Sequence, residues 1–179
     1  MTSNREQRIA KVQSKRQHDI TVIFENVHDP HNISACLRSC DAVGIQEVFI
    51  ISPNEKKETR LGKKSSASAA KWLTIHHFFD VKQCFEEVRK KFSKIYSTRL
   101  DANAIGLYEM DFSQSIALVF GNEHEGVSEE AAGLSDGNFM IPQVGMIQSL
   151  NVSVACAVTL YEAFRQRRKS DAIGSSLKT

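Results

Sequence analysis

Polar residues and glycines gather at three places where the sequence predicts the end of a strand, and the clearest is the run from Ile141 to Ala155. A strand is expected to end there at Pro142, a loop with Gly145 follows, and Ser149 occupies the position expected of a helix N-cap. The start of that helix would direct free backbone N–H groups at a ligand. The chemistry expected of this run is therefore ligand binding at a helix N-terminus.

The other two places have the same character. A fully apolar predicted strand ends abruptly at Gly121, where glycine permits close approach of the backbone to a ligand, and Glu123 stands at the mouth of this strand. After the first predicted strand, Asn32 can cap the next helix, and Arg38 lies six residues further on, towards one side of it. All three places lie at predicted carboxyl ends of strands.

Familiar nucleotide-binding and hydrolase motifs are missing from the sequence. Gly121 and Gly126 have the spacing that opens a P-loop, but Val127-Ser128-Glu129 follows in place of lysine and serine or threonine. No G-x-G-x-x-G follows the first predicted strand, and no G-x-S-x-G occurs. We expect no metal site, because a recognisable ligand spacing is absent among His28, His31, Cys36 and Cys40.

The elements that must position these residues alternate between strands and helices. Residues 19–24 are rich in β-branched side chains and predict a buried strand, and the helix that follows is expected to end at Gly44. Such alternation predicts an α/β fold, a mostly parallel sheet flanked by helices on both faces, with ligands at the carboxyl ends of the strands. Further strands are expected at 47–51, 72–78, 94–99, 115–120 and 138–142, and helices at 4–17, 80–91, 128–134 and about 149–168.

Length and composition fit one soluble domain, because 179 residues with 41% hydrophobic and 25% charged side chains can bury a core without metals or disulfides. No apolar run is long enough to span a bilayer, and the polar first residues lack a signal-peptide core, so we expect no membrane partner and a cytoplasmic protein. Buried free thiols are expected for the four cysteines, Cys36, Cys40, Cys84 and Cys156.

The net charge of +2 hides an uneven distribution. Residues 1–16 and residues 165–179 each carry five basic and one acidic side chain, which leaves a charge of −6 for the body between them. Basic ends suit a polyanionic partner, although solvated tails have the same composition. We expect a basic N-terminal helix over 1–18, a main domain over 19–168 and a flexible basic tail over 169–179, while the role of residues 53–71, with a basic loop at 53–64, stays open.

The three segments, in this order, resemble the motifs of the SpoU-type RNA 2′-O-methyltransferases of the SPOUT superfamily, and the match runs from about Arg16 to Arg168. The resemblance implies a C-terminal deep trefoil knot, a homodimer and S-adenosyl-L-methionine (AdoMet) as the methyl donor. The short length resembles most the branch that methylates the D-loop guanosine of tRNA, Gm18. The segments that carry it are Asn32…Arg38, Gly121-Asn122-Glu123…Gly126 and Ile141-Pro142…Ser149-Leu150-Asn151-Val152-Ser153.

The resemblance also implies roles for single residues. Arg38 would activate the ribose 2′-OH, but a guanidinium is almost never deprotonated, so binding a phosphate and stabilising the developing alkoxide is its physically easier role. The implied catalytic residues are Arg38, Asn32, Glu123, Ser149 and Asn151, and the implied AdoMet contacts are Thr98, Gly121, Ile141 and Leu150.

Two alternatives stay open at this point. The same chemistry could act on ribosomal RNA or on another tRNA nucleotide, because the motifs hold the cofactor and the hydroxyl rather than read a sequence. The chain could also be a non-catalytic module that binds RNA through its basic ends. In either case the expected RNA contacts are Arg8, Lys11, Arg16, Arg165, Arg167 and Arg168.

Overall fold

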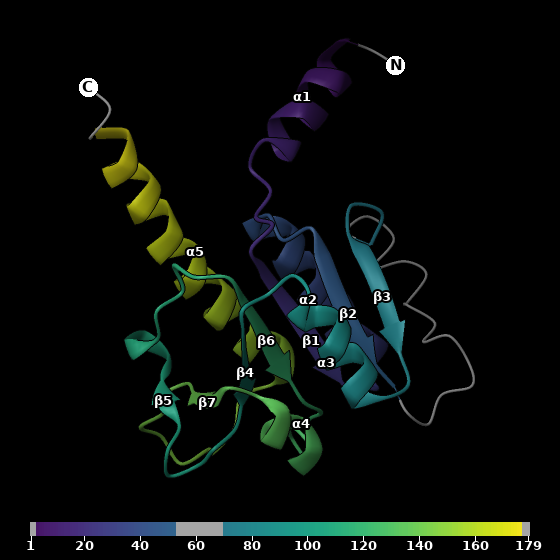
Figure 1. Cartoon of the computed structure of the whole chain (residues 1–179), viewed down its shortest axis with the longest axis vertical. Coiled ribbons are helices and arrows are strands. Elements are labelled where there is room, and N and C mark those ends of the chain that lie inside the picture. The colour runs from purple at the N-terminus through teal and green to yellow at the C-terminus, as the bar shows by residue number, and fades with distance from the viewer. Residues whose placement is uncertain (1–2, 53–69, 177–179) are drawn as a thin grey trace.

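One parallel sheet of seven strands runs through the middle of the molecule (Figure 1). The structure is a computed structural model, and it describes residues 3–52 and 70–176. The strands are β1 (Ile20–Glu25), β2 (Glu47–Ile51), β3 (Thr74–Phe78), β4 (Lys94–Thr98), β5 (Ile105–Gly106), β6 (Ile116–Phe120) and β7 (Gly137–Met140). Their order across the sheet is β3-β2-β1-β6-β4-β7-β5, and all neighbouring pairs are parallel.

Helices cover both faces of this sheet. The helices are α1 (Ser3–Gln13), α2 (Pro30–Val43), α3 (Val81–Arg89), α4 (Glu129–Leu134) and α5 (Val152–Ser176), with a short 3-10 helix η1 (Leu107–Glu109). Helices α2 and α5 pack against each other on one face, whereas α3 and α4 cover the other face. Helix α1 projects from the body, beyond the amino ends of the strands (Figure 1).

The core explains why the central strands form where they do. In β1, Val22 and Phe24 face α2 and α5, whereas Ile23 between them faces α3 and α4. All residues of β1 and β6 are buried, because a central parallel strand has helices on both of its sides. The predicted α/β class, with a mostly parallel sheet flanked by helices, is therefore confirmed.

Several element boundaries differ from the sequence prediction. Helix α1 ends at Gln13 rather than at residue 17, because the chain after it turns into the fold. Helix α5 begins at Val152 and continues to Ser176, beyond the expected end at 168. The strand β5 and the helix η1 were not predicted, because two and three residues are too few to show a period. The predicted basic loop at 53–64 lies outside the described residues.

Both predicted N-caps were wrong. At α2 the cap is Asp29 rather than Asn32. The carboxylate of Asp29 accepts a hydrogen bond at 2.8 Å from the N–H of His31, and Pro30 occupies the first helical position. Helix α5 begins at Val152, so Asn151 rather than Ser149 stands before its first residue. Oδ1 of Asn151 accepts a hydrogen bond at 2.8 Å from the N–H of Ser153. These corrections free Asn32 and Ser149 for other contacts.

Helix α5 is buried on one side only, although apolar residues lie all round its first turns. Val154 and Tyr161 have 46% and 54% of their surface exposed, although Cys156 and Leu160 on the opposite side belong to the core. The helix therefore presents an apolar outer face. Within the described residues, no helix is long and apolar enough to cross a membrane.

The predicted C-cap at Gly44 is confirmed and generates a stability prediction. Gly44 has φ of +88°, and an added Cβ would lie 2.7 Å from the carbonyl oxygen of Lys15. Gly44→Ala is therefore expected to lower the free energy of unfolding by about 1–3 kcal/mol, measured by urea denaturation. The control is Gly133→Ala in α4, where an added Cβ has open space, and it should raise the same quantity by about 0.5–1 kcal/mol. Equal effects of the two variants would contradict this account.

Candidate functional site

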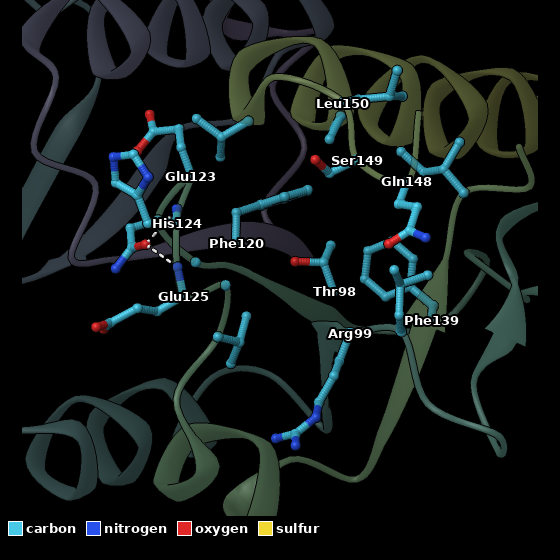
Figure 2. Close-up of a pocket in the computed structure, with 18 of the residues that line it drawn as sticks. Thr98, Arg99, Phe120, Glu123, His124, Glu125, Phe139, Gln148, Ser149 and Leu150 are labelled. Carbon is cyan, nitrogen blue, oxygen red and sulfur yellow. Dashed lines mark hydrogen bonds between the residues drawn. The ribbon is translucent and has the colours of Figure 1, made fainter. Parts of the chain in front are cut away.

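A cavity of about 450 Å³ opens at the carboxyl ends of β4, β6 and β7, where the sequence predicted a ligand-binding crevice (Figure 2). Its walls come from the residues after β4, from the turn after β6 and from the loop between β7 and α5. In Figure 2, Glu123 and Glu125 lie on one side of the cavity, Ser149 and Leu150 lie on the other, and Thr98 lies between them. The volume is in the range of small-molecule sites.

The turn after β6 is built so tightly that it requires glycine. A Cβ on Gly121 would lie 2.0 Å from the carbonyl carbon of Gly126, so only glycine lets the chain fold back on itself here. The side chain of Asn122 closes the turn, because its Oδ1 accepts hydrogen bonds from the N–H groups of His124 at 2.8 Å and Glu125 at 2.7 Å (Figure 2). The turn thereby fixes the direction in which Glu123 leaves the strand end.

One amide connects the three segments that the sequence singled out. Asn32, in the first turn of α2, donates a hydrogen bond from Nδ2 to Oε1 of Glu123 after β6. Its Oδ1 accepts a hydrogen bond at 3.1 Å from Nδ2 of Asn151, the cap of α5. Both ends of the Asn32 side chain are therefore committed, and Asn32, Glu123 and Asn151 form one network beside the cavity.

Arg38 lies outside this network. It is exposed on α2, does not line the cavity and, among the described residues, makes no hydrogen bond or ion pair. Its guanidinium is therefore available to an anionic ligand. Ser149 is also exposed, but it does line the cavity.

All four residues predicted to contact a cofactor line the cavity: Thr98, Gly121, Ile141 and Leu150. The hydroxyl of Thr98 is already used, because it donates to the carbonyl oxygen of Val119 at 3.0 Å and so ties β4 to β6. Thr98 can therefore shape the cavity, whereas its hydroxyl hydrogen is occupied within the protein.

Sequence reasoning missed two features of the cavity. Oε1 of Gln143 is buried and accepts no hydrogen bond from the described residues, although Gln143 lines the cavity. Arg99 extends to α4 and pairs with Glu129 at the rim, and this guanidinium lowers the pKa of the Glu129 carboxyl. The position of Gln143 inside the run 141–155 was a signal, but no pattern shows from sequence that its oxygen is buried.

The six basic residues predicted to bind RNA fall into two groups. The guanidinium of Arg16 lies inside the fold, where it donates to the carbonyl oxygen of Ile45 at 2.7 Å and pairs with Asp41 at 2.8 Å. Arg167 similarly pairs with Asp19, and it donates a hydrogen bond at 2.7 Å to the carbonyl oxygen of Gln114, just before β6. These two arginines attach the ends of the chain to the body. The exposed members are Arg8, Lys11, Arg165 and Arg168.

The four cysteines are buried and free, as predicted. Burial raises the pKa of the Cys84 thiol to about 12, so that this thiol is neutral at physiological pH. The described residues contain no group of three or more histidine, cysteine, aspartate or glutamate side chains arranged to hold a metal ion.

Comparisons with known proteins agree on one family. The model of the SpoU rRNA Methylase family matches residues 19–161. The tRNA (guanosine(18)-2′-O)-methyltransferase of Thermus thermophilus is 44% identical over 169 residues, which are 94% of this chain and 86% of that enzyme.

Solved structures give the same result for the fold. The A. aeolicus TrmH/SpoU tRNA modifying enzyme superposes with a TM-score of 0.86 at 37% identity, over 94% of this chain and 85% of that one. The SpoU methyltransferase AviRb from Streptomyces viridochromogenes, in complex with AdoMet, superposes with a TM-score of 0.75 at 26% identity, over 84% of this chain and 59% of that one.

Proposed function

Because the chain belongs to the SpoU rRNA Methylase family, we propose that it transfers a methyl group from AdoMet to the ribose 2′-OH of guanosine 18 in tRNA. The observation that carries this proposal is the network of Asn32, Glu123 and Asn151, which joins the three motif segments beside one cavity. The substrate assignment follows the Thermus thermophilus relative, which aligns along 94% of the chain. From this substrate we infer that the protein acts in the cytoplasm.

The residues present fit AdoMet, which supplies a methyl group activated on a positively charged sulfonium. Phe139, Ile141 and Leu150 give the cavity an apolar end that suits an adenine ring, and Glu123 lies towards the other side. Gly121 lines the cavity, and its missing Cβ lets the turn close against the backbone of Gly126, which holds this wall of the cavity in place. The unsatisfied oxygen of the cavity residue Gln143 needs a hydrogen-bond donor, which a bound ligand can supply, since a buried acceptor without one costs about 1–3 kcal/mol.

The mechanism requires that a weakly acidic hydroxyl be held in line with the methyl group. Arg38 has a free guanidinium, which can bind the phosphate next to the target ribose and stabilise the alkoxide as it forms. Asn32, Glu123 and Asn151 act by position, because their hydrogen bonds hold the start of α2 against the cavity. Ser149 lines the cavity and is free to touch cofactor or ribose.

We extend the proposal to the assembly. A homodimer would cover the apolar side chains that the single chain exposes, because contiguous exposed apolar surface marks interaction sites. The deep trefoil knot implied by the family resemblance belongs to the same proposal. Five of the exposed large apolar side chains of the described residues lie on α5 and in the loop before it, and this is the surface that we assign to the dimer: Val144, Met146, Ile147, Val154 and Tyr161.

The proposed function is tested by incubating the protein with labelled AdoMet and, in parallel reactions, unmodified tRNA or unmodified ribosomal RNA, followed by mapping of the methylated ribose. Guanosine 18 is expected to carry the label, and label in ribosomal RNA alone would contradict the substrate. Arg38→Ala should abolish transfer while AdoMet affinity stays within a few-fold of wild type, because Arg38 does not line the cavity. Substantial turnover by this variant would remove Arg38 from the mechanism.

Gln143 is expected to accept a hydrogen bond from the 6-amino group of adenine, because it shares its loop with the apolar end of the cavity. Wild-type protein should then bind S-adenosylhomocysteine about 10- to 100-fold more tightly than S-inosylhomocysteine, which has an oxygen in place of that amine. Calorimetry should show this ratio falling towards one in Gln143→Leu. The matched control is Gln148→Leu, at another glutamine of the cavity, which should keep the wild-type ratio.

The two groups of basic residues should respond differently to neutralisation. Replacing Arg8 and Arg168 with glutamine is expected to weaken tRNA binding and to lower the salt dependence of log K by roughly one unit per lost phosphate contact. Thermal stability should barely change, because both side chains are exposed and neither makes a hydrogen bond or ion pair with a described residue. Arg167→Gln should instead lower the melting temperature, because it leaves Asp19 unpaired. An unchanged salt slope in the double variant would make these arginines mere surface charges.

A further inference from the structure

A second hollow lies far from the cavity, between α1 and Trp72. We call it the α1 groove and define it by Arg5, Arg8, Ile9, Val12 and Trp72; its volume is about 360 Å³. Trp72 precedes β3, so the groove lies at the amino edge of the sheet, whereas the cavity lies at the carboxyl edge. The proposed methyl transfer uses none of these residues except Arg8, which was expected to contact RNA.

The aromatic side of the groove is attached to the fold. The carbonyl oxygen of Trp72 accepts a hydrogen bond at 3.0 Å from Nη2 of Arg16, and the buried guanidinium of Arg16 also binds Asp41 and Ile45. The residue Trp72 nevertheless keeps 44% of its surface exposed. A large aromatic ring on a fixed backbone, open to solvent, offers a stacking surface that needs little reorganisation to be used.

The helical side of the groove is basic. Arg5 and Arg8 are one turn apart on α1, both are exposed, and neither makes a hydrogen bond or ion pair with a described residue. The acidic side chain that lines the groove, Asp41, is already paired with Arg16. Two uncommitted positive charges therefore stand beside an open aromatic ring and the apolar side chains of Ile9 and Val12.

We propose that the α1 groove binds an unpaired nucleotide of the substrate RNA, with its base stacked on Trp72 and its flanking phosphates bound by Arg5 and Arg8. Aromatic rings framed by basic side chains are the recurring means of holding single-stranded nucleotides, because each base has a π-face and each linkage a negative charge. The inference rests on the proposed function for its RNA substrate. It adds an anchoring point remote from the reacting ribose.

Trp72 is the only tryptophan in the chain, so fluorescence excited at wavelengths that tyrosine does not absorb reports on this ring alone. Titration of the full-length protein with unmodified tRNA is expected to quench this emission as a base stacks on the ring. A blunt RNA duplex has no unpaired base, so it should bind electrostatically without comparable quenching.

Two substitutions separate stacking from packing. Trp72→Phe keeps a π-face and should bind tRNA within a few-fold of wild type, whereas Trp72→Leu fills apolar space without a π-face and should bind about 5- to 100-fold more weakly. AdoMet affinity, and turnover at saturating tRNA, should be unchanged in both, because Trp72 does not line the cavity. Phe79→Leu, at an aromatic residue with 64% exposure after β3, is the control and should bind tRNA like wild type.

Equal tRNA affinities of Trp72→Phe and Trp72→Leu would overturn the inference, and so would equal quenching by the duplex. An emission change with protein concentration alone, and none on adding tRNA, would assign the groove to a second copy of the chain and also overturn it. Methylation of guanosine 18 without quenching leaves the proposed function intact while this inference fails. Quenching by tRNA without any methyl transfer supports the groove and removes the proposed reaction.

Discussion

The geometry of the candidate site depends on the two hydrogen bonds of one side-chain amide. Asn32 binds Glu123, 91 residues later, and Asn151, 119 residues later. Each bond contributes only about 0.5–1.5 kcal/mol, so these bonds do not create the arrangement. The buried sheet does, because β1 and β6 are neighbours and bring the starts of α2 and of the β6 turn to one edge. The amide then selects one relative position of the three segments from those that the sheet allows.

The basic residues at the two ends of the chain have two different roles, because some pair with carboxylates of the fold and others stay exposed. The sequence predicts basic ends around an acidic body, and one arginine from each end neutralises part of the negative charge of the body: Arg16 pairs with Asp41, and Arg167 pairs with Asp19. The arginine fork is suited to this, because it reaches several oxygens at once. The basic ends are consequently held in place by some of their own charges, whereas Arg8, Lys11 and Arg168 stay exposed for a polyanion.

Prediction from the sequence was most accurate where burial of apolar side chains alone determines which residues form a strand. The apolar strands β1 and β6 were placed to within a residue or two, because only a buried position suits such runs. It failed where two polar residues compete for one helix end, as Asp29 and Asn32 do, and where a charged residue has a partner distant in sequence, as Arg16 has in Asp41. The four expected cofactor contacts were predicted through motif resemblance and line the cavity, whereas the unsatisfied oxygen of Gln143 depends on tertiary packing.

The cysteines connect the core with the site. Cys36 and Cys40 on α2 and Cys156 on α5 are fully buried in the cluster between the two helices. The hydrogen bond to Cys156 and burial raise the pKa of the Cys36 thiol, so it stays uncharged in this contact. Small neutral side chains let α2 and α5 approach closely, and the starts of these helices carry Asn32 and Asn151. The spacing of two helices, set by residues without a role in the reaction, therefore determines whether the amide that aligns the site can reach both of its partners.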